Sequence, residues 1–209
     1  MMSRFLTKTF HSKGRLNLEH PKVQEQKRKD FLIYFPREDS FLLEREVKKY
    51  AKGKSFLDLG TGSGIQSRAA KQAGAKSILS ADINDEALKE LKSQGFKTIK
   101  SDIFSKIKGK FDLIAFNPPY LPRDKREDKE SALTTTGGKN GDELIIKFLK
   151  DVKKHINKNG IILLVVSSLT PREKILKILE KNSLEYKVIT SQKFFFETLE
   201  VWKIKKSLS

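Results

Sequence analysis

The chain has 209 residues, a net charge of +17 and no cysteine. This length suits one globular domain with a short extension, and no apolar run approaches the roughly 20 residues that a membrane-spanning helix needs. Without cysteine, disulfides, thiolate metal sites and cysteine nucleophiles are excluded, and a reducing interior such as the cytoplasm is the expected setting. The three histidines are scattered along the chain, so we expect no metal site.

The positive charge has two interpretations. A basic surface attracts anionic partners, so contact with RNA or with the ribosome is one possibility. Alternatively, the lysines pair with glutamates on helix surfaces, as in the segments EREVKK and EALKELK. Such pairing is typical of heat-adapted proteins and favours an archaeal source. We favour the second interpretation.

Residues 1–30 have no strong hydrophobic periodicity and carry no acidic side chain before Glu19. This pattern predicts a basic N-terminal arm, which we favour over a targeting peptide because such peptides prefer arginine and a clean amphipathic face. Residues 31–209 are then expected to form one domain.

Short apolar strands alternate with amphipathic helices from residue 39 onward. The first helix places Leu43, Val47, Tyr50 and Ala51 on one face. Strands are predicted at 55–59, 77–82, 97–102, 111–116, 160–166, 184–192 and 197–204. Further helices are predicted at 63–74, 85–95, 142–156 and 172–181.

This alternation predicts an α/β fold with a mostly parallel, Rossmann-like sheet and helices on both faces. The last two strand segments are too close for a helical crossover, so they should form a C-terminal antiparallel hairpin. In such sheets, ligands bind beyond the carboxyl ends of the strands.

A glycine-rich turn, DLGTGSG, follows the first predicted strand. The glycines allow a tight turn and close approach of the backbone to a ligand, and the next helix offers its N-terminal amides. The spacing fits neither the dinucleotide fingerprint nor the phosphate-binding P-loop.

The second and third strands also end in polar residues. Asp82 follows Gly60 at roughly the 20-residue distance at which nucleoside-binding sheets place an acid for the ribose hydroxyls. Alternatively, Asp82 or Asn84 caps the next helix. After the third strand, Asp102 and Ile103 suit hydrogen bonding to an adenine amino group and coverage of its face.

The fourth strand ends in Asn117-Pro118-Pro119-Tyr120. Two prolines hold the backbone in an extended turn, so the Asn117 carboxamide oxygen and the Pro118 carbonyl become neighbouring acceptors. Two fixed acceptors fit the two hydrogens of one NH2 group, and Tyr120 offers a flat face for stacking.

These motifs, in this order, resemble class I S-adenosylmethionine-dependent methyltransferases that act on amino groups of adenine or glutamine. The segments PREDSFLLE, GGKNGDELIIKFL and ETLEVWKI further resemble the HemK family, in its archaeal and eukaryotic release-factor branch. The likeness covers residues 34–204 and implies a seven-stranded methyltransferase sheet.

The resemblance implies S-adenosyl-L-methionine as the cofactor. The glycine turn would hold its methionine part, and the segment PREDSFLLE would close over its amino-acid end. The implied cofactor residues are Glu38, Asp39, Ser40, Asp58, Gly60, Thr61, Gly62, Gly64, Asp82, Ile83, Asp102, Ile103 and Asn117. The implied acceptor residues are Asn117, Pro118, Pro119 and Tyr120, with Asn117, Pro118 and Tyr120 in the catalytic role.

The resemblance also implies a substrate and a partner. The substrate would be the glutamine of the Gly-Gly-Gln motif in a class I peptide chain release factor. The partner would be a small zinc-binding activator subunit at the edge formed by the third strand. Two alternatives stay open: an adenine N6-methyltransferase acting on RNA or DNA, and an inactive RNA- or ribosome-binding module with the same fold. The polar segment 123–139 is expected to form a loop at the mouth of the site.

Overall fold

A computed structural model describes residues 36–122 and 136–207. The predicted N-terminal arm and most of the segment 123–139 lie outside the described residues. The strands are β1 (Ser55–Leu59), β2 (Ser77–Asp82), β3 (Lys97–Lys100), β4 (Phe111–Phe116), β5 (Ile156–Ser167), β6 (Leu184–Lys193) and β7 (Thr198–Lys206). The helices are α2 (Glu38–Tyr50), α3 (Ile65–Gln72), α4 (Asp85–Ser93), α6 (Glu143–His155) and α7 (Glu173–Lys181).

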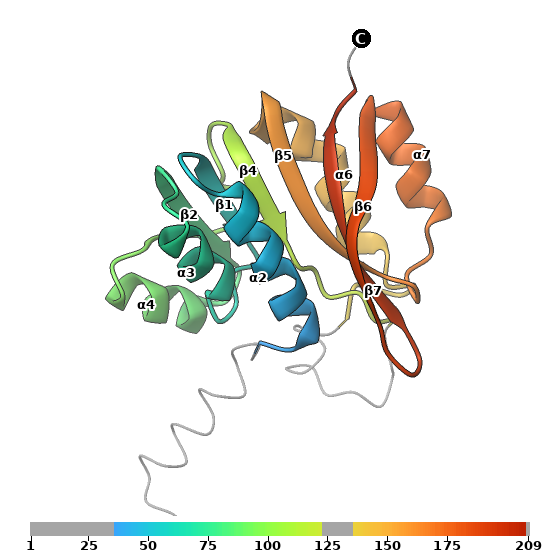
Figure 1. Ribbon diagram of the computed structural model, residues 1–209, viewed down its shortest axis with the longest axis horizontal. Helices are drawn as coiled ribbons and strands as arrows, with labels where there is room; N and C mark the ends of the chain where they lie inside the picture. Colours follow the sequence, from blue (N-terminus) through green and yellow to red (C-terminus); the bar gives the residue numbers. More distant parts are fainter. Residues whose placement is uncertain (1–35, 123–135, 208–209) are drawn as a thin grey trace, which may run out of the picture.

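The seven strands form one sheet in the order β3-β2-β1-β4-β5-β7-β6 (Figure 1). Neighbours from β3 to β5 run parallel, and β7 runs antiparallel to both β5 and β6. The predicted fold class, including the C-terminal antiparallel hairpin, is therefore confirmed. The chain leaves β1 toward β2 on one side and returns as β4 on the other, so the switch point of the sheet lies between β1 and β4.

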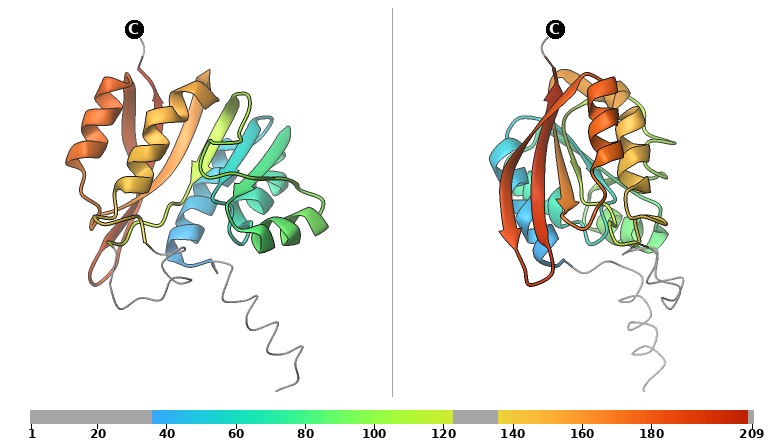
Figure 2. Two further views of the ribbon diagram at one scale, coloured as in Figure 1. Left: turned by 180° about the vertical axis from the view of Figure 1, so that it is seen from behind. Right: turned by 90° about the vertical axis from the view of Figure 1, so that its right-hand side faces the viewer.

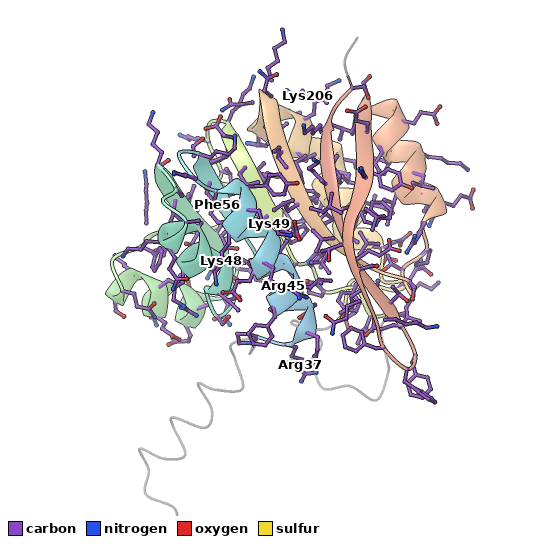
Figure 3. All side chains as sticks on the ribbon, in the orientation of Figure 1. Arg37, Arg45, Lys48, Lys49, Phe56 and Lys206 are labelled. Atoms are coloured by element: carbon purple, nitrogen blue, oxygen red, sulfur yellow. The ribbon has the colours of Figure 1, made fainter. Side chains whose placement is uncertain are left out.

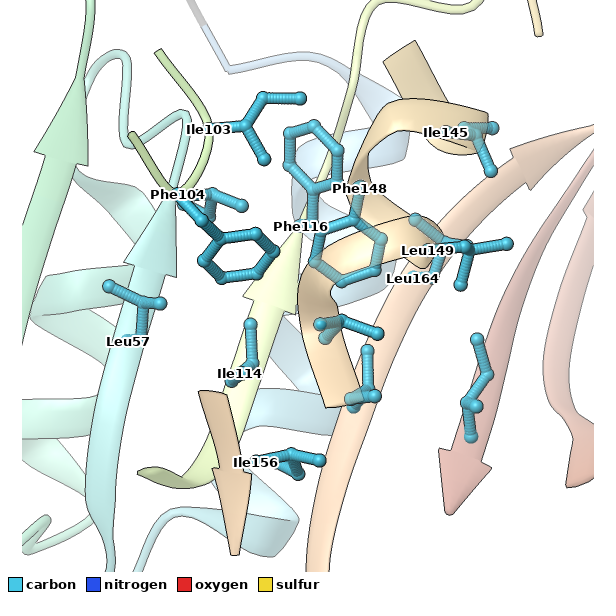
Figure 4. Packing of buried hydrophobic residues seen from close by; sticks show 14 of the residues in the cluster. Leu57, Ile103, Phe104, Ile114, Phe116, Ile145, Phe148, Leu149, Ile156 and Leu164 are labelled. Atoms are coloured by element: carbon cyan, nitrogen blue, oxygen red, sulfur yellow. The ribbon is translucent and has the colours of Figure 1, made fainter. Parts of the chain in front are cut away.

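Helices cover both faces of the sheet (Figure 2). The pair α2 and α3 lies on one face, and α6 and α7 lie on the other. The side chains of β4 alternate between two buried clusters: Leu113 and Ala115 face the α2 side, and Ile114 and Phe116 face the α6 side. Figure 4 shows Phe116 packed with Phe148 of α6. A sheet buried on both faces explains why residues 161–166 of β5 form an unbroken apolar run.

The observed strand boundaries differ from the predicted ones by up to four residues, and the structure gives a reason for two of the differences. β5 begins at Ile156, where the predicted strand began at residue 160, because Ile156 pairs with Phe111 and Asn157 Nδ2 donates to Asp112 Oδ1 at 2.7 Å. β3 ends at Lys100, because a turn begins at the next residue: the Ser101 amide still donates to the Asp82 carbonyl at 2.9 Å, and its Oγ donates to the carbonyl of Ile103 at 2.8 Å. No helix within the described ranges has both the length and the apolar character to cross a membrane.

Candidate functional site

A cavity of about 550 Å³ lies at the carboxyl ends of the parallel strands, around the switch point. Its walls come from the loops after β1, β2, β3 and β4, the first turn of α2 and the β6–β7 hairpin. The predicted site residues in its lining are Glu38, Asp39, Ser40, Gly60, Thr61, Gly62, Asp82, Ile83, Asp102, Ile103, Asn117, Pro118, Pro119 and Tyr120. The fold thus brings these predicted residues together from five separate segments of the chain.

Two predicted cofactor residues, Asp58 and Gly64, do not line the cavity. Asp58 alternates with Leu57 and Leu59 along β1, so its side chain lies on the α3 face and is buried. There it accepts hydrogen bonds from Thr61 Oγ1 at 2.6 Å and from Ser67 Oγ at 2.7 Å. The carboxylate therefore links the glycine turn, through Thr61, to α3, through Ser67.

Burial raises the pKa of Asp58 to about 6, although hydrogen bonds from Thr61 and Ser67 oppose the rise. The folded pKa lies above the unfolded value of about 3.9, so the folded state holds the extra proton between these values. The stability that this group contributes is present below pH 4 and is lost as the pH rises through 6. The ionised form is the less stable one in this buried position.

We expect Asp58→Asn to remove this pH dependence. Between pH 4 and pH 7, the free energy of unfolding of the wild type should fall by roughly 2 kcal/mol relative to the variant. Urea unfolding of both proteins across this range measures the difference. Asp112→Asn is the control, because hydrogen bonds from Ser55 lower the pKa of Asp112 to about 2 and place its effect below pH 4. Parallel curves for the wild type and Asp58→Asn would refute the assignment.

The sequence left open whether Asp82 faces a ligand or caps the next helix, and in the structure Asp82 and Asn84 take one of these positions each. Asp82 lines the cavity, and its two carboxylate oxygens accept from the amides of Gly62 at 2.8 Å and Asn84 at 2.9 Å. Burial raises the pKa of Asp82, and these two amides oppose the rise. Asn84 caps α4, since its Oδ1 accepts from the amide of Glu86 at 2.9 Å. Binding of a ribose by Asp82 stays a prediction.

The turn after β3 presents Asp102 and Ile103 to the cavity in different ways. Asp102 is exposed and pairs with Lys147 on α6 at 2.6 Å. Ile103 is buried with a φ of 51°, which is uncommon for a β-branched residue. The Ser101 hydroxyl bonded to its carbonyl holds this conformation. The turn thereby places an apolar side chain in the cavity wall, as covering an adenine face would require.

The residues after β4 carry an unusual polar atom. Asn117 Oδ1 is buried and has no hydrogen-bond partner among the described residues. A buried acceptor without a partner costs about 1–3 kcal/mol, so such atoms call for an explanation. Asn117 lines the cavity, so a bound NH donor would satisfy the atom.

Tyr120 forms part of the same wall and is half-buried. Burial raises its pKa, and the carboxylates of Asp39 and Glu197 raise it further. The phenol therefore stays protonated in any physiological buffer. Tyr120 is available as a flat ring or a hydrogen-bond donor rather than as a base.

The segment GGKNG, residues 137–141, packs against the backbone of the turn after β4. A Cβ on Gly137 would lie 2.6 Å from the carbonyl oxygen of Pro119, and a Cβ on Gly141 would overlap the carbonyl oxygen of Tyr120. The amide of Gly137 donates to the carbonyl of Leu121 at 2.9 Å. These glycines let a second chain segment pack directly on the turn after β4 and hold it in place.

Several lining residues were not predicted. Gln66 at the start of α3 donates from Nε2 to the Ser40 carbonyl at 2.9 Å, and its Oε1 is buried without a partner in the described chain. Its position directly after the glycine turn could have suggested it. The hairpin residues Phe194 and Glu197 have no such signal, because only the sheet topology brings them to the cavity.

The charge of the cavity is opposite in sign to that of the chain. Among the described lining residues, Arg37 is the one cationic side chain. The acidic lining residues are Glu38, Asp39, Asp82, Asp102 and Glu197. This lining favours a cationic ligand and repels phosphate groups.

Comparisons with known proteins agree with this geometry. Residues 38–196 match the family model for the methyltransferase small domain. The chain is 34% identical over 183 residues to a putative protein N5-glutamine methyltransferase of Methanocaldococcus jannaschii, covering 82% of this chain and 92% of that protein. It is 31% identical over 193 residues to the methyltransferase HEMK2 of Homo sapiens, covering 84% and 90%.

A solved structure has the same architecture. The chain superposes with a TM-score of 0.69 and 27% identity on a chain of the Mtq2–Trm112 complex of E. cuniculi, covering 84% of this chain and 99% of that one. That complex is described as responsible for methylation of the eRF1 translation termination factor.

Proposed function

Because the chain belongs to the methyltransferase small domain family, we propose that it methylates the side-chain nitrogen of a glutamine in a class I release factor, within the Gly-Gly-Gln motif. The methyl donor of class I methyltransferases is S-adenosylmethionine, which supplies an electrophilic methyl group on a sulfonium. The observation that carries the proposal is the buried, unpartnered Oδ1 of Asn117 in the cavity wall. A free hydrogen-bond acceptor at this place supports an amino or amide nitrogen, which carries N–H groups, as the atom that receives the methyl group.

The cavity has the features that this cofactor requires. The turn Gly60–Gly62 brings backbone close to the ligand, and Asp82 presents a carboxylate for the ribose hydroxyls. Half-exposed Ile83 and buried Ile103 offer apolar contacts for the adenine. The acidic lining suits a sulfonium cation. These residues would bind and orient the cofactor.

The turn after β4 would activate the acceptor. A glutamine amide is a weak nucleophile because its nitrogen lone pair is delocalised into the carbonyl. Asn117 Oδ1 and the Pro118 carbonyl would accept its two N–H groups, raise the electron density on nitrogen and aim the lone pair. Tyr120 would stack its ring against the planar amide. The product nitrogen can release its proton to water or a carbonyl afterwards, so no strong base is needed.

The charge distribution favours a protein substrate over a nucleic acid. An RNA or DNA acceptor would bring phosphates to a cavity with five carboxylates in its described lining. Positive charge gathers elsewhere: Figure 3 places Lys206 at the opposite end of the sheet from Arg37. Burial lowers the pKa of Lys206, and the nearby Lys110 and Lys153 lower it further. Contact of that basic end with RNA or the ribosome stays a prediction.

A small activator subunit would complete the enzyme. The structural relative from E. cuniculi occurs in a complex with Trm112. In this chain, β3 is an edge strand of the sheet, so its outer backbone groups are available for pairing. We assign the partner to this edge, expect it to bind zinc, as the resemblance implies, and place the reaction in the cytoplasm.

Transfer of labelled methyl groups tests the function. Incubation with labelled S-adenosylmethionine and a purified class I release factor should label one glutamine, more rapidly when the activator subunit is present. A release factor with alanine in place of that glutamine is the control and should stay unlabelled. Label that enters only RNA or DNA would refute the proposed substrate and favour the adenine alternative. Absence of transfer to every acceptor would favour the inactive module.

A further inference from the structure

Two phenylalanines project from the tip of the β6–β7 hairpin. Phe195 is 92% exposed and Phe196 is 84% exposed. The turn is closed by a hydrogen bond from the amide of Phe194 to the carbonyl of Glu197, at 2.7 Å. The two rings contact each other edge to face, with centroids 4.7 Å apart. Large aromatic side chains held in water on a defined turn are typical of interaction sites.

The tip is continuous with the cavity. Phe194 and Glu197, which flank the two phenylalanines, both line the cavity wall. In Figure 1 the hairpin extends past the end of the sheet at which α2 begins and β4 ends. Three other exposed apolar side chains lie at the same wall: Ile83 and Leu121 are part of the lining, and Phe41 follows the lining residue Ser40. Apolar surface therefore borders the entrance to the site.

We propose that Phe195 and Phe196 form a docking surface for the polypeptide that carries the acceptor glutamine. This inference rests on the proposed function and extends it to a contact outside the cavity. While the glutamine loop enters the cavity, the two rings would pack on an apolar patch of the same substrate. Each ring has up to about 150–250 Å² of surface to bury in such a contact.

A polypeptide fits this surface better than a nucleic acid. The edge-to-face arrangement, with an interplanar angle of 81°, does not present the parallel ring faces on which successive bases stack. Glu197 follows Phe196 and the exposed Lys193 precedes Phe194, so the tip carries no excess of positive charge that would attract phosphates.

A second copy of this chain fits less well. A stable interface buries about 800 Å² on each partner, which two phenyl rings cannot supply alone. A substrate also held in the cavity needs only a secondary contact at the tip. The two contacts together would hold the substrate more tightly than either one alone.

The expected kinetic effect follows from the position of the tip. Phe195 and Phe196 are not in the cavity lining, so they do not touch the reacting atoms. Their loss should weaken substrate binding before and during transfer alike, which raises KM and leaves kcat unchanged.

The test compares Phe195→Ala/Phe196→Ala with the control Leu176→Ala/Val188→Ala, which shortens two exposed apolar residues away from the cavity. Initial rates are measured with labelled S-adenosylmethionine and a purified release factor, in complex with the activator subunit. We expect KM for the release factor to rise at least about tenfold in the Phe variant, equivalent to 1.4 kcal/mol. Its kcat, its affinity for S-adenosylhomocysteine and its Tm should match those of the control.

An unchanged KM in the Phe variant, with release factor labelled normally by the wild type, overturns the inference alone. A wild type that labels no release factor overturns the proposed function and the inference with it. Two further readouts address the other occupants. If KM stays unchanged, loss of ribosomal RNA binding in the Phe variant would assign the tip to RNA. Conversion of a dimer to a monomer in sedimentation would then assign it to a second copy of the chain, and either result would overturn the inference.

Discussion

Asn117→Ala is expected to lower kcat by about 10²–10³-fold, the range seen when one fixed hydrogen-bonding group is removed from an active site. Asn117 Oδ1 is buried, lines the cavity and has no partner among the described residues, so it is available to an acceptor NH group. Without it, one of the two contacts that orient the amide nitrogen is lost. Single-turnover rates with release factor and labelled S-adenosylmethionine measure the effect.

Two measurements separate this loss from a general loss of folding. Affinity for S-adenosylhomocysteine, measured by calorimetry, should be retained in Asn117→Ala. Asn157→Ala is a matched control, because it removes the same side chain from a site where Nδ2 donates to Asp112 and which is not in the cavity lining. Full turnover by Asn117→Ala would refute the role assigned to this residue. Loss of cofactor binding would instead show that Asn117 holds the cofactor rather than the methyl-accepting amide.

Gly64→Ala is expected to destabilise the protein by roughly 2–5 kcal/mol, the sum of a backbone cost and a packing cost. Gly64 has a φ of +78° at the start of α3, a conformation that side chains disfavour. A Cβ there would also overlap the buried side chain of Leu91 on α4, with Cγ at 3.0 Å. Thermal unfolding should show a Tm lower by roughly 5–15 °C.

Gly74→Ala is the matched control for the packing term. Gly74 has nearly the same φ, +79°, but no atom lies within 4 Å of the position of its Cβ. This variant should lose only the backbone cost of about 1–2 kcal/mol. Gly64→Ala should also lose affinity for S-adenosylhomocysteine, because Gly64 ends the turn that lines the cavity. Equal losses of Tm in the two variants would show that α4 moves aside and that the close packing at Gly64 does not contribute to the stability of the protein.

The strand and helix order was predictable because its signals are local. Apolar alternation, glycines at helix ends and the Asn84 cap each act within a few residues. The early start of β5, by contrast, depends on a partner far along the chain, because Ile156 pairs with Phe111. A strand continues as long as a neighbour offers hydrogen bonds, and the neighbour is decided by the fold.

The site divides in the same way. The turn after β1, the acid at Asp82 and the Asn-Pro-Pro-Tyr turn could be found from sequence, because each sits at the end of its own strand and parallel strands end at one edge. The sequence could not show whether a given residue in such a motif faces the ligand. Asp58 belongs to the same motif as Gly60, yet it is buried under α3 and does not line the cavity.

By itself, then, the sequence determined the α/β order and the polar turns at the strand ends, and it predicted Asn117 and Pro118 as a pair of acceptors. These depend on residue type and short spacing. The tertiary structure alone decided that Glu197 and Phe194 line the cavity, that the cavity is acidic in a basic protein, and that the exposed Phe195 and Phe196 lie next to its wall. The hairpin residues reach the cavity because β7 inserts beside β5, a pairing that local spacing does not specify. The acidic lining arises because the fold gathers carboxylates from several distant segments at one edge of the sheet.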